Sequence, residues 1–449
     1  MEKFFKEARQ FFKLGIPIYG SQLSYGAIQL TDTMIAGRAG SQELAGVALG
    51  SSLATPLFFS LSGIMFAITP IVAHLFGAKK ISEIRSKMRQ SIWIAVGIGT
   101  ILTIAYYHAS NFLKLSTIDQ DIIEISDAYL KSLAIGAIAM MWFTCLRCFS
   151  EGVTQTLPVF WVAFSAMILN IPLDIILVNG YLGFPKLGGA GCGYATSIIY
   201  LYMASAMTII VMKKQFYKEL SFFKKIQFPS LFTLKELMFL GMPIGIGIFV
   251  ELSMFSGAAL ILGPLGDIVL ASHSIALSIA SIAFMLPLSI GLAAAARVGN
   301  LLGEGNLEGA KYASKLAITI TLFSAAINTI AIILFDEWIV SFFTSETLVF
   351  STALSLLVLA AIFQLPDGFQ MGTLGSLRGY KDTFIPMVLL MISYWVFALP
   401  AGYFLTYIGV SEPLGARGVW IGMIIGLSIF SMLAALRLRF IMKVSLRQL

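Results

Sequence analysis

The chain has 449 residues, of which 58% are hydrophobic and only 12% are charged, and its mean hydropathy is +0.88. Soluble globular proteins carry about 25% charged residues, so this composition excludes an ordinary soluble domain and indicates a protein of the lipid bilayer. The formal net charge of +7 comes from basic residues that lie mainly between the apolar stretches, where they determine membrane topology. We therefore expect no nucleic-acid partner.

The chain opens with MEKFFKEARQFFK, which mixes charges with phenylalanines. It lacks a short apolar core followed by a small-residue cleavage site, so it predicts an amphipathic lead-in and not a cleaved signal peptide. Apolar stretches long enough to cross about 30 Å of hydrocarbon then recur to the end of the chain. We predict twelve spanning helices, at about residues 14–37, 46–76, 91–110, 127–147, 158–179, 189–212, 237–262, 268–296, 313–334, 349–375, 384–408 and 414–436. Their length excludes a β-barrel, whose strands have about 10 residues.

The distribution of Lys and Arg predicts the orientation of these spans. Twelve spans place both termini on one side, and if that side is the cytoplasm, all but five of the 30 Lys and Arg residues lie in cytoplasmic segments or at their edges. An excess of basic residues in cytoplasmic loops is typical of membrane proteins. The five exceptions are Arg38, Lys114, Lys131, Lys186 and Arg417.

The chain also repeats itself. LGIPI at 14–18 recurs as LGMPI at 240–244, a shift of 226, while Gly152 and Gly191 match Gly379 and Gly418 at a shift of 227. A nearly constant offset over such a length indicates a duplicated unit. Six spans per unit make the two halves parallel, so we predict two six-helix lobes related by a pseudo-two-fold axis along the membrane normal.

We predict an N-terminal lobe at 1–212, a polar cytoplasmic linker at 213–236 and a C-terminal lobe at 237–449. The linker is identified by its lysines, which are Lys213, Lys214, Lys218, Lys224, Lys225 and Lys235.

Four lone acidic residues lie inside the apolar stretches: Asp32, Asp174, Glu251 and Asp367. No Lys or Arg is close to them in sequence, and placing such a charge at the bilayer centre costs about 2.5–3.5 kcal/mol on insertion scales. Buried acids of this kind bind a cation, carry a proton or face a cationic ligand. These acids do not follow the repeat, because the residue equivalent to Asp32 is Ala258 and the residue equivalent to Glu251 is Tyr25. Each half therefore has its own acidic positions.

In the N-terminal half, Asp32, Asn170, Asp174 and Thr196 all lie toward the outer ends of their predicted spans. Asn170 and Asp174 are four residues apart and therefore share a helix face. We expect these four side chains to converge on a site for a hard cation or a proton. Pro172 cannot donate a backbone hydrogen bond and frees a carbonyl as a further ligand.

In the C-terminal half, Glu251 lies midway along the seventh span, and Asp367 directly follows Pro366 in the tenth. We expect Pro366 to interrupt that helix and to release the carbonyl of Ile362. An interrupted helix beside a buried acid is typical of the cation site of a transporter.

The remaining polar residues are less informative. Cys145 and Cys148 lack a second pair, and we interpret them as small packing residues. We interpret His74 and His273 as packing residues whose hydrogen bonds are satisfied. No basic residue lies deep in the predicted spans. Some of the 35 Phe and 20 Met residues could line a cavity for lipophilic cations, through cation–π and thioether contacts.

The sequence resembles the multidrug and toxic compound extrusion (MATE) family, and within it the NorM branch, over essentially its full length. The resemblance lies in NIPLD at 170–174, LGGAGCGYAT at 187–196, PDGFQMGTLGSLRGYKD at 366–382 and PLGARGVWIG at 413–422. It also includes Pro17, Asp32 and Gly37 in the first span and Glu251 in the seventh.

The resemblance implies an antiporter of the bacterial inner membrane that exports lipophilic organic cations in exchange for Na⁺ or H⁺. It implies that Glu251 and Asp367 are the coupling acids of one lobe, and that Asp32, Asn170, Asp174 and Thr196 form the polar site of the other. Four acids are thus Na⁺ candidates: Glu251, Asp367, Asp32 and Asp174. One departure is Phe363, since NorM-like proteins can carry Tyr there, which removes a hydroxyl ligand. We favour Na⁺ over H⁺ on the length of the match.

Three other functions are less well supported. A lipid-linked saccharide flippase of the same superfamily needs basic residues in its cavity. An intramembrane enzyme is disfavoured because HExxH, GxSxG and DDxxD are all missing from the sequence. An ion channel is disfavoured because no filter-like repeat occurs. We therefore expect a non-enzymatic, monomeric transporter that needs no cofactor beyond its coupling ion.

Overall fold

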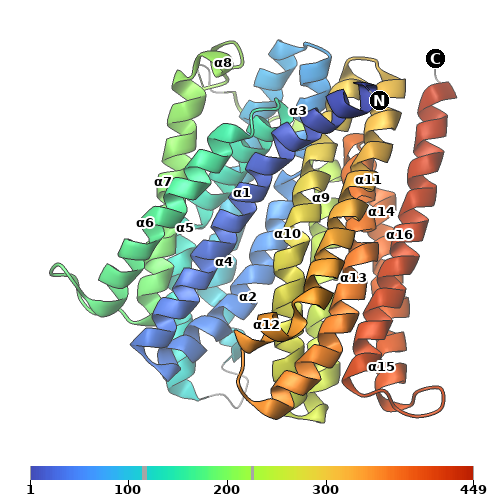
Figure 1. Cartoon of the computed structure of the whole chain (residues 1–449). Helices are drawn as coiled ribbons and strands as arrows, with labels where there is room; N and C mark the ends of the chain where they lie inside the picture. Colours follow the sequence, from blue (N-terminus) through green and yellow to red (C-terminus); the bar gives the residue numbers. More distant parts are fainter. Residues whose placement is uncertain (1, 114–118, 224–226, 448–449) are drawn as a thin grey trace. The chain divides into compact units, whose positions relative to one another are not determined.

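We describe a computed structural model of the chain, which covers residues 2–113, 119–223 and 227–447. The described residues are helical except for turns and short connections, which confirms the predicted all-α membrane fold (Figure 1). Three residues used in the sequence predictions, Lys114, Lys224 and Lys225, lie outside the described residues.

The chain forms two compact units. We call Ile16–Gly245 the N unit, and the C unit comprises the residues up to Gly15 together with the chain from Ile246 onward. The two units are defined by compactness alone. The lobes at 1–212 and 237–449 and the linker at 213–236 therefore stay a prediction.

Two helices pass from one unit to the other, and the rest belong to one unit each. The shared helices are α1 (Glu2–Ala39) and α9 (Leu231–Leu262). The N unit also contains α2 (Ser41–Met65), α3 (Ile68–Gly77), α4 (Ile81–Leu113), α5 (Gln120–Gly152), α6 (Leu157–Asn179), α7 (Gly189–Lys213) and α8 (Gln215–Lys218). The C unit continues with the 3₁₀ turn η1 (Gly263–Leu265), α10 (Asp267–Gly303), α11 (Leu307–Leu334), α12 (Asp336–Ser341), α13 (Thr347–Gly379), α14 (Phe384–Met391), the π-helical segment η2 (Ile392–Ala398), α15 (Leu399–Tyr407) and α16 (Ala416–Arg447).

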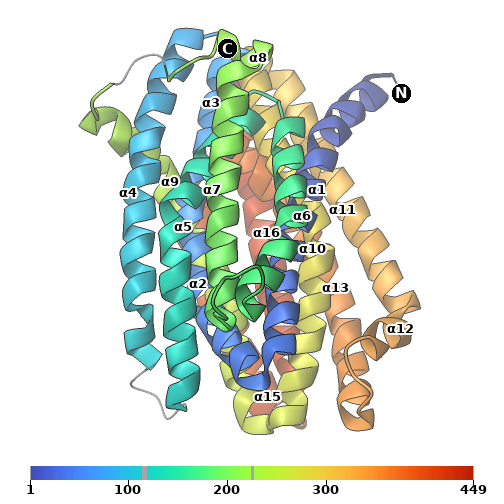
Figure 2. The same ribbon diagram turned by 90° about the vertical axis from the view of Figure 1, so that its left-hand side faces the viewer.

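By length and apolar composition, the described residues contain eleven candidate membrane spans, where twelve were predicted. The exception is the first predicted span, which lies within the 38-residue helix α1. The second half of α1 contains serine, glutamine and threonine residues and Asp32, which lower its mean hydropathy. The helix is therefore long enough to span a membrane but is not apolar enough to count as a candidate span. The beginning of α1 and the end of α16 lie at the same end of the C unit (Figures 1 and 2).

The second predicted span is two helices and not one. The helix α2 ends at Met65, and α3 begins at Ile68 after a turn in which Phe66 N–H bonds to the carbonyl of Gly63. Pro70 explains the break, because it has no N–H to offer to the carbonyl of Phe66, four residues earlier. The side chain of Thr69 secures the break by donating to the Cys148 carbonyl of α5 at 3.3 Å.

Other prolines do not interrupt their helices. The helix α6 runs through Pro172 and α13 runs through Pro366, so the predicted interruption of the tenth span is wrong. Neighbouring helices donate to two other carbonyls around Pro366: Ser431 donates to the Pro366 carbonyl at 2.9 Å, and Thr329 donates to the carbonyl of Ala361 at 2.8 Å. The carbonyl that loses its helical donor to Pro366 is that of Ile362, four residues earlier. The release of the Ile362 carbonyl stays a prediction.

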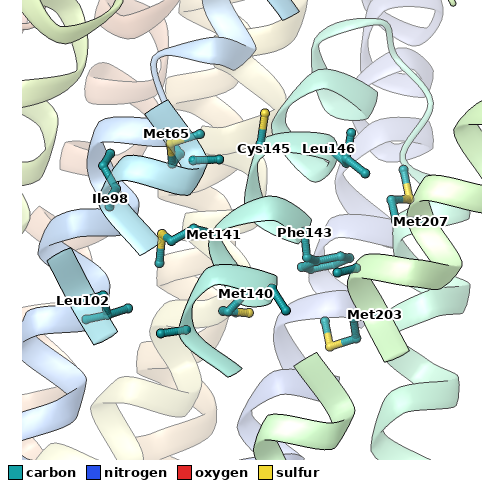
Figure 3. Close-up of a cluster of buried hydrophobic side chains, with 14 of the residues drawn as sticks. Met65, Ile98, Leu102, Met140, Met141, Phe143, Cys145, Leu146, Met203 and Met207 are labelled. Carbon is teal, nitrogen blue, oxygen red and sulfur yellow. The ribbon is translucent and has the colours of Figure 1, made fainter. Parts of the chain in front are cut away.

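The N unit is organised around α5, which packs against α2, α4 and α7 (Figure 2). Unbranched methionine side chains fill much of this core (Figure 3). Cys145 lies among them, and both it and Cys148 are buried free thiols. This packing agrees with the interpretation of the two cysteines as small core residues.

The segment that follows α8 is fastened to α4 by its backbone. Three side chains of α4, Arg85, Arg89 and Trp93, donate to the carbonyls of Glu219, Phe222 and Gln227. Gln90 donates to the Phe228 carbonyl and accepts from the Ser230 N–H. The described parts of the predicted polar linker, on either side of residues 224–226, therefore contact α4, and its end from Leu231 onward is already helical.

The C unit is organised around α13, which packs against α10, α11 and α16. The closest approach of α10 and α13 is at Gly291 and Gly375, where a Cβ on Gly375 would overlap the Gly291 backbone. Glycine is thus required by the crossing itself. At the beginning of α1, the Glu7 carboxylate pairs with the Arg297 guanidinium of α10 through two hydrogen bonds, of 2.6 and 2.9 Å. A bidentate pair of this kind fixes orientation as well as charge.

The helix α10 contains Pro287, which leaves the carbonyl of Ala283 without its helical donor. Asn328 of α11 supplies a replacement, because its Nδ2 donates to the Ala283 carbonyl at 2.7 Å. An amide on one helix thereby satisfies a proline-freed carbonyl on its neighbour.

We predict that Asn328→Ala lowers the free energy of unfolding by about 1–3 kcal/mol, the usual cost of stranding a buried acceptor. In a Pro287→Ala background, residue 287 regains its N–H and the same substitution costs much less. A double-mutant cycle of denaturant or thermal unfolding measures the difference. Equal costs of Asn328→Ala in the two backgrounds would show that the two residues are not coupled.

Candidate cation-coupling sites

Four polar residues of the N unit meet between α1, α6 and α7. The Asp32 carboxylate accepts from Thr196 Oγ1 at 2.9 Å and from Asn170 Nδ2 at 3.4 Å. The Asp174 carboxyl lies within hydrogen-bonding reach of the Asp32 carboxyl. The structure therefore brings together the four residues that the sequence had grouped, and all of them are at most 5% exposed.

The cluster has more acceptors than donors. Both carboxyl oxygens of Asp174 and the Oδ1 of Asn170 are buried without a hydrogen-bond donor among the described residues. Two carboxyl groups can bond to each other only through a proton, and a buried charge without a partner costs several kcal/mol. The free oxygens thus call for a proton or for a cation.

The ligand chemistry of this cluster is that of a hard cation. Carboxylate and amide oxygens suit Na⁺-like or alkaline-earth ions, whereas softer transition metals prefer nitrogen and sulfur. The described residues contain no group of three or more His, Cys, Asp or Glu side chains that could hold a metal ion.

In the C unit, Glu251 of α9 is linked to two neighbours by a chain of hydrogen bonds. Gln370 Nε2 donates to the Glu251 carboxylate at 2.9 Å, and the Tyr394 hydroxyl donates to Gln370 Oε1 at 2.7 Å. Tyr394 lies in the π-helical segment η2, a type of helix defect that is frequent at functional sites. The amide of Gln370 is thereby oriented with its donor toward the acid.

Asp367 lies on α13, three residues before Gln370, and is 4% exposed. It is close enough to Glu251 for their charges to interact, and it forms no hydrogen bond with another described residue. Phe363, one turn earlier, is 4% exposed and packs edge-on against Phe255 and Trp420. Its ring completes an aromatic wall and provides no oxygen.

Several residues around Glu251 were not found from the sequence. Gln370 and Tyr394 carry ordinary polar groups in apolar helices, and only their tertiary contacts with the acid single them out. Arg378, in the last turn of α13, interacts electrostatically with Glu251. No Lys or Arg is close to Glu251 in sequence, and it is the packing of α13 that brings this distant residue near it.

The sequence matches the profile of the MatE family twice, over residues 17–176 and 243–404. The chain belongs to the MatE family. The two matched segments begin at Pro17 and Pro243, the same residues of the LGIPI and LGMPI motifs that revealed the repeat. MatE proteins are transporters and not enzymes, which confirms both the resemblance to the MATE family and the non-enzymatic class.

Curated bacterial members of the family are similar over nearly their whole length. The chain is 37% identical to the "Probable multidrug resistance protein NorM" of Idiomarina loihiensis, covering 96% of this chain and 94% of the relative. It is 35% identical to the multidrug resistance protein PmpM of Pseudomonas aeruginosa, covering 96% and 91%. It is 34% identical to the multidrug resistance protein MdtK of Yersinia pseudotuberculosis, covering 99% and 97%.

Solved structures show the same fold at low sequence identity. The crystal structure of the eukaryotic MATE transporter AtDTX14 matches with a TM-score of 0.89 at 20% identity, covering 99% of both chains. An outward-facing multidrug resistance MATE transporter matches with a TM-score of 0.88 at 20% identity, covering 98% of this chain and 96% of the other.

This MatE protein also contains a buried ion pair in the N unit, which corrects the prediction that no basic residue lies deep in its helices. Arg147 and Glu151 of α5 are 8% and 2% exposed, and Arg147 Nε donates to Glu151 Oε1 at 2.8 Å. The guanidinium also lies over two aromatic rings, with centroids at 5.6 Å for Tyr25 and 5.7 Å for Phe66. Arg147 thus connects α1, the α2–α3 break and α5.

The repeat also relates the residues of this ion pair to residues of the C unit. At the shift of 227, Glu151 corresponds to Arg378 and Arg147 corresponds to Leu374, and at the shift of 226 that relates the earlier motifs, Tyr25 corresponds to Glu251. An acid at the C-terminal end of a helix is disfavoured by the helix dipole, whereas Arg378 is favoured there. Glu151 is therefore explained by its bond to Arg147, and the MatE repeat carries opposite charges at equivalent places.

The interpretation of His273 as a satisfied packing residue was also wrong. This side chain of α10 is 1% exposed, and neither ring nitrogen has a hydrogen-bond partner among the described residues. Its ring packs edge-on against Trp420, with the centroids 5.7 Å apart. His273 therefore fills space in an aromatic cluster without satisfying its own polar atoms.

We predict that Arg147→Met costs about 3–5 kcal/mol of unfolding free energy, because it strands the buried Glu151 carboxylate. The double variant Arg147→Met/Glu151→Leu recovers most of the loss. The matched control is Lys131→Met on the same helix, which breaks an exposed pair with Asp127 (2.7 Å) and costs less than about 1 kcal/mol. Thermal unfolding in detergent distinguishes the cases, and equal losses at the two sites would contradict the assignment of Arg147.

Proposed function

We propose that the chain is a multidrug efflux antiporter of the bacterial inner membrane that exports lipophilic organic cations in exchange for Na⁺. The observation that carries the proposal is the acidic cluster of the N unit. Asp32 and Asp174 are adjacent and buried, and among the described residues they have no basic partner and three acceptor oxygens there lack donors. An intramembrane acid of this kind belongs to an ion or proton pathway by default.

The substrate class is supported by the bacterial relatives, which are named as multidrug resistance proteins. Both termini lie in the cytoplasm in this proposal, which follows the distribution of Lys and Arg along the sequence. The lobes are 1–212 and 237–449, the linker is 213–236, and the transporter acts as a monomer.

Na⁺ is our preferred coupling ion because of the oxygen count. Asp32, Asp174 and the Asn170 carbonyl oxygen supply ligands in the N unit, and Glu251 and Asp367 supply them in the C unit. A proton-coupled antiporter is the second candidate. It is favoured by the C unit, where Gln370 already occupies one Glu251 oxygen and Phe363 offers no hydroxyl.

A lipid-linked saccharide flippase is not supported by the buried arginine. The charge of Arg147 is already neutralised by Glu151 at 2.8 Å. A pyrophosphate group would have to displace that carboxylate, and a desolvated ion pair is expensive to separate.

We predict that an imposed Na⁺ gradient drives uptake of an organic-cation drug into inverted vesicles at constant pH, with a protonophore present. A proton gradient imposed in Na⁺-free buffer drives little uptake. Both arms use the same vesicles, and vesicles without the protein give the background. Uptake that ignores Na⁺ and collapses with the protonophore would establish proton coupling instead.

We predict that Asp32→Asn, Asp174→Asn, Glu251→Gln and Asp367→Asn each reduce gradient-driven export to background while the protein still folds. The reason is that buried acids cost stability and so are not needed for the fold. Asp267→Asn, at the exposed beginning of α10, is the matched control and keeps normal export. Drug export is measured alongside the yield of monodisperse protein, and normal export by any of the first four variants would remove that residue from the coupling site.

A further inference from the structure

A groove of about 330 Å³ lies within the C unit, between α10, α11 and the short helix α12. Nine of its ten lining residues are apolar, and the exception is Asn328. Sites for small organic molecules are typically apolar cavities of about 300–1,000 Å³, so this groove is at the lower end of that range.

The groove exists because small residues line the two long helices and α12 follows at the end of α11 (Figure 2). Ala283 of α10 and Ala331 of α11 face it, and their methyl groups leave space that larger side chains would fill. The Asn328 amide uses one of its two Nδ2 hydrogens for the Ala283 carbonyl, and it is the one polar side chain among the ten lining residues. We therefore expect an occupant that is apolar over most of its length.

The surroundings of the groove are exposed to hydrocarbon. Ile282 is 56% exposed, Ile330 57% and Leu334 69%, and all three belong to helices that qualify as membrane spans. Exposed apolar side chains on a spanning helix contact lipid tails. The groove thus opens onto acyl chains and not onto water.

The helix α12 places one end of the groove at the polar boundary of the bilayer. It begins with Asp336 and Glu337, and its Trp338 packs edge-on, at 4.7 Å, against Phe342, which directly follows the helix; the two are 63% and 70% exposed. Exposed Trp and Phe beside acids are typical of the interface between tails and headgroups. A lipid whose tail fills the groove would therefore have its headgroup beside α12.

The charge of this segment selects among headgroups. The stretch 335–346, FDEWIVSFFTSE, contains three acids and no Lys, Arg or His. It repels an anionic phosphatidylglycerol headgroup and attracts the amine of an aminophospholipid.

We propose that this groove binds one acyl chain of an aminophospholipid of the phosphatidylethanolamine type, with the amine beside Asp336 and Glu337. The tail runs along Ala331 and Ile332, and Trp338 covers the end of the tail that lies beside α12. This site is independent of the cation-coupling acids and of the proposed drug transport, so its failure and theirs are separable.

Bromine-labelled lipids test the proposal, because bromine on an acyl chain quenches tryptophan fluorescence on contact. The full chain is reconstituted in vesicles of phosphatidylethanolamine and phosphatidylglycerol at equal mole fraction, with one lipid brominated at a time. The contribution of Trp338 is the difference between the wild type and Trp338→Phe. We expect brominated phosphatidylethanolamine to quench Trp338 with about threefold higher apparent affinity, a modest difference well within a factor of ten.

Two matched variants locate the effect in the groove. Ala331→Phe fills it and removes the preference, whereas Ile330→Phe, on the adjacent exposed face of α11, keeps it. If Ala331→Phe fails to give monodisperse protein, Ala331→Leu replaces it. Asp336→Asn/Glu337→Gln removes the headgroup preference and leaves total lipid retention after detergent purification unchanged, as measured by mass spectrometry.

Three results would overturn the proposal. Equal quenching by the two brominated lipids would remove the headgroup selectivity. Equal behaviour of Ala331→Phe and Ile330→Phe would show that the tail contacts the general surface and not the groove. Relief of Trp338 quenching by tetraphenylphosphonium, without any difference between the lipids, would assign the groove to an organic cation.

Discussion

Hydrocarbon offers no hydrogen-bond partners, so the backbone polar groups of these helices have to be satisfied within the protein. The prolines show the constraint most clearly. Pro287 frees the Ala283 carbonyl and Asn328 reaches across from α11 to satisfy it, while Ser431 and Thr329 donate to the carbonyls of Pro366 and Ala361. Such contacts connect helices within each unit, and they let proline occur in spans that remain helical.

The same constraint separates structural charges from functional ones. Glu151 is paired with Arg147 at 2.8 Å, so its charge is balanced inside the N unit. Asp174 is equally buried, but neither of its oxygens has a donor among the described residues. This difference in partners is the physical basis of our proposal that Asp174 takes part in coupling while Glu151 has a structural role.

Much of this organisation could be predicted from the sequence because it depends on patterns along the chain. Apolar length gave the spans, a constant offset gave the repeat, and lone acids in apolar helices gave the residues of both clusters. The break at Phe66 was missed because Pro70 acts four residues away, within an unbroken apolar run. Arg147, Gln370 and Tyr394 were missed because their roles come from contacts between helices. Asn328 looks like any other polar residue until the proline opposite it is known.

The two LG-x-PI motifs place a proline close to the point where each shared helix passes from one unit to the other: Pro17 in α1 and Pro243 in α9. A helix bends most easily where a proline has already removed a backbone hydrogen bond. Asp32 is 15 residues beyond Pro17 and Glu251 is eight residues beyond Pro243, which are lever arms of about 22 and 12 Å at 1.5 Å per residue. A bend of about 20° at each proline would therefore displace Asp32 by about 8 Å and Glu251 by about 4 Å. Equal bends at the two equivalent prolines would thus give unequal displacements, with the larger one at the acid of the N unit.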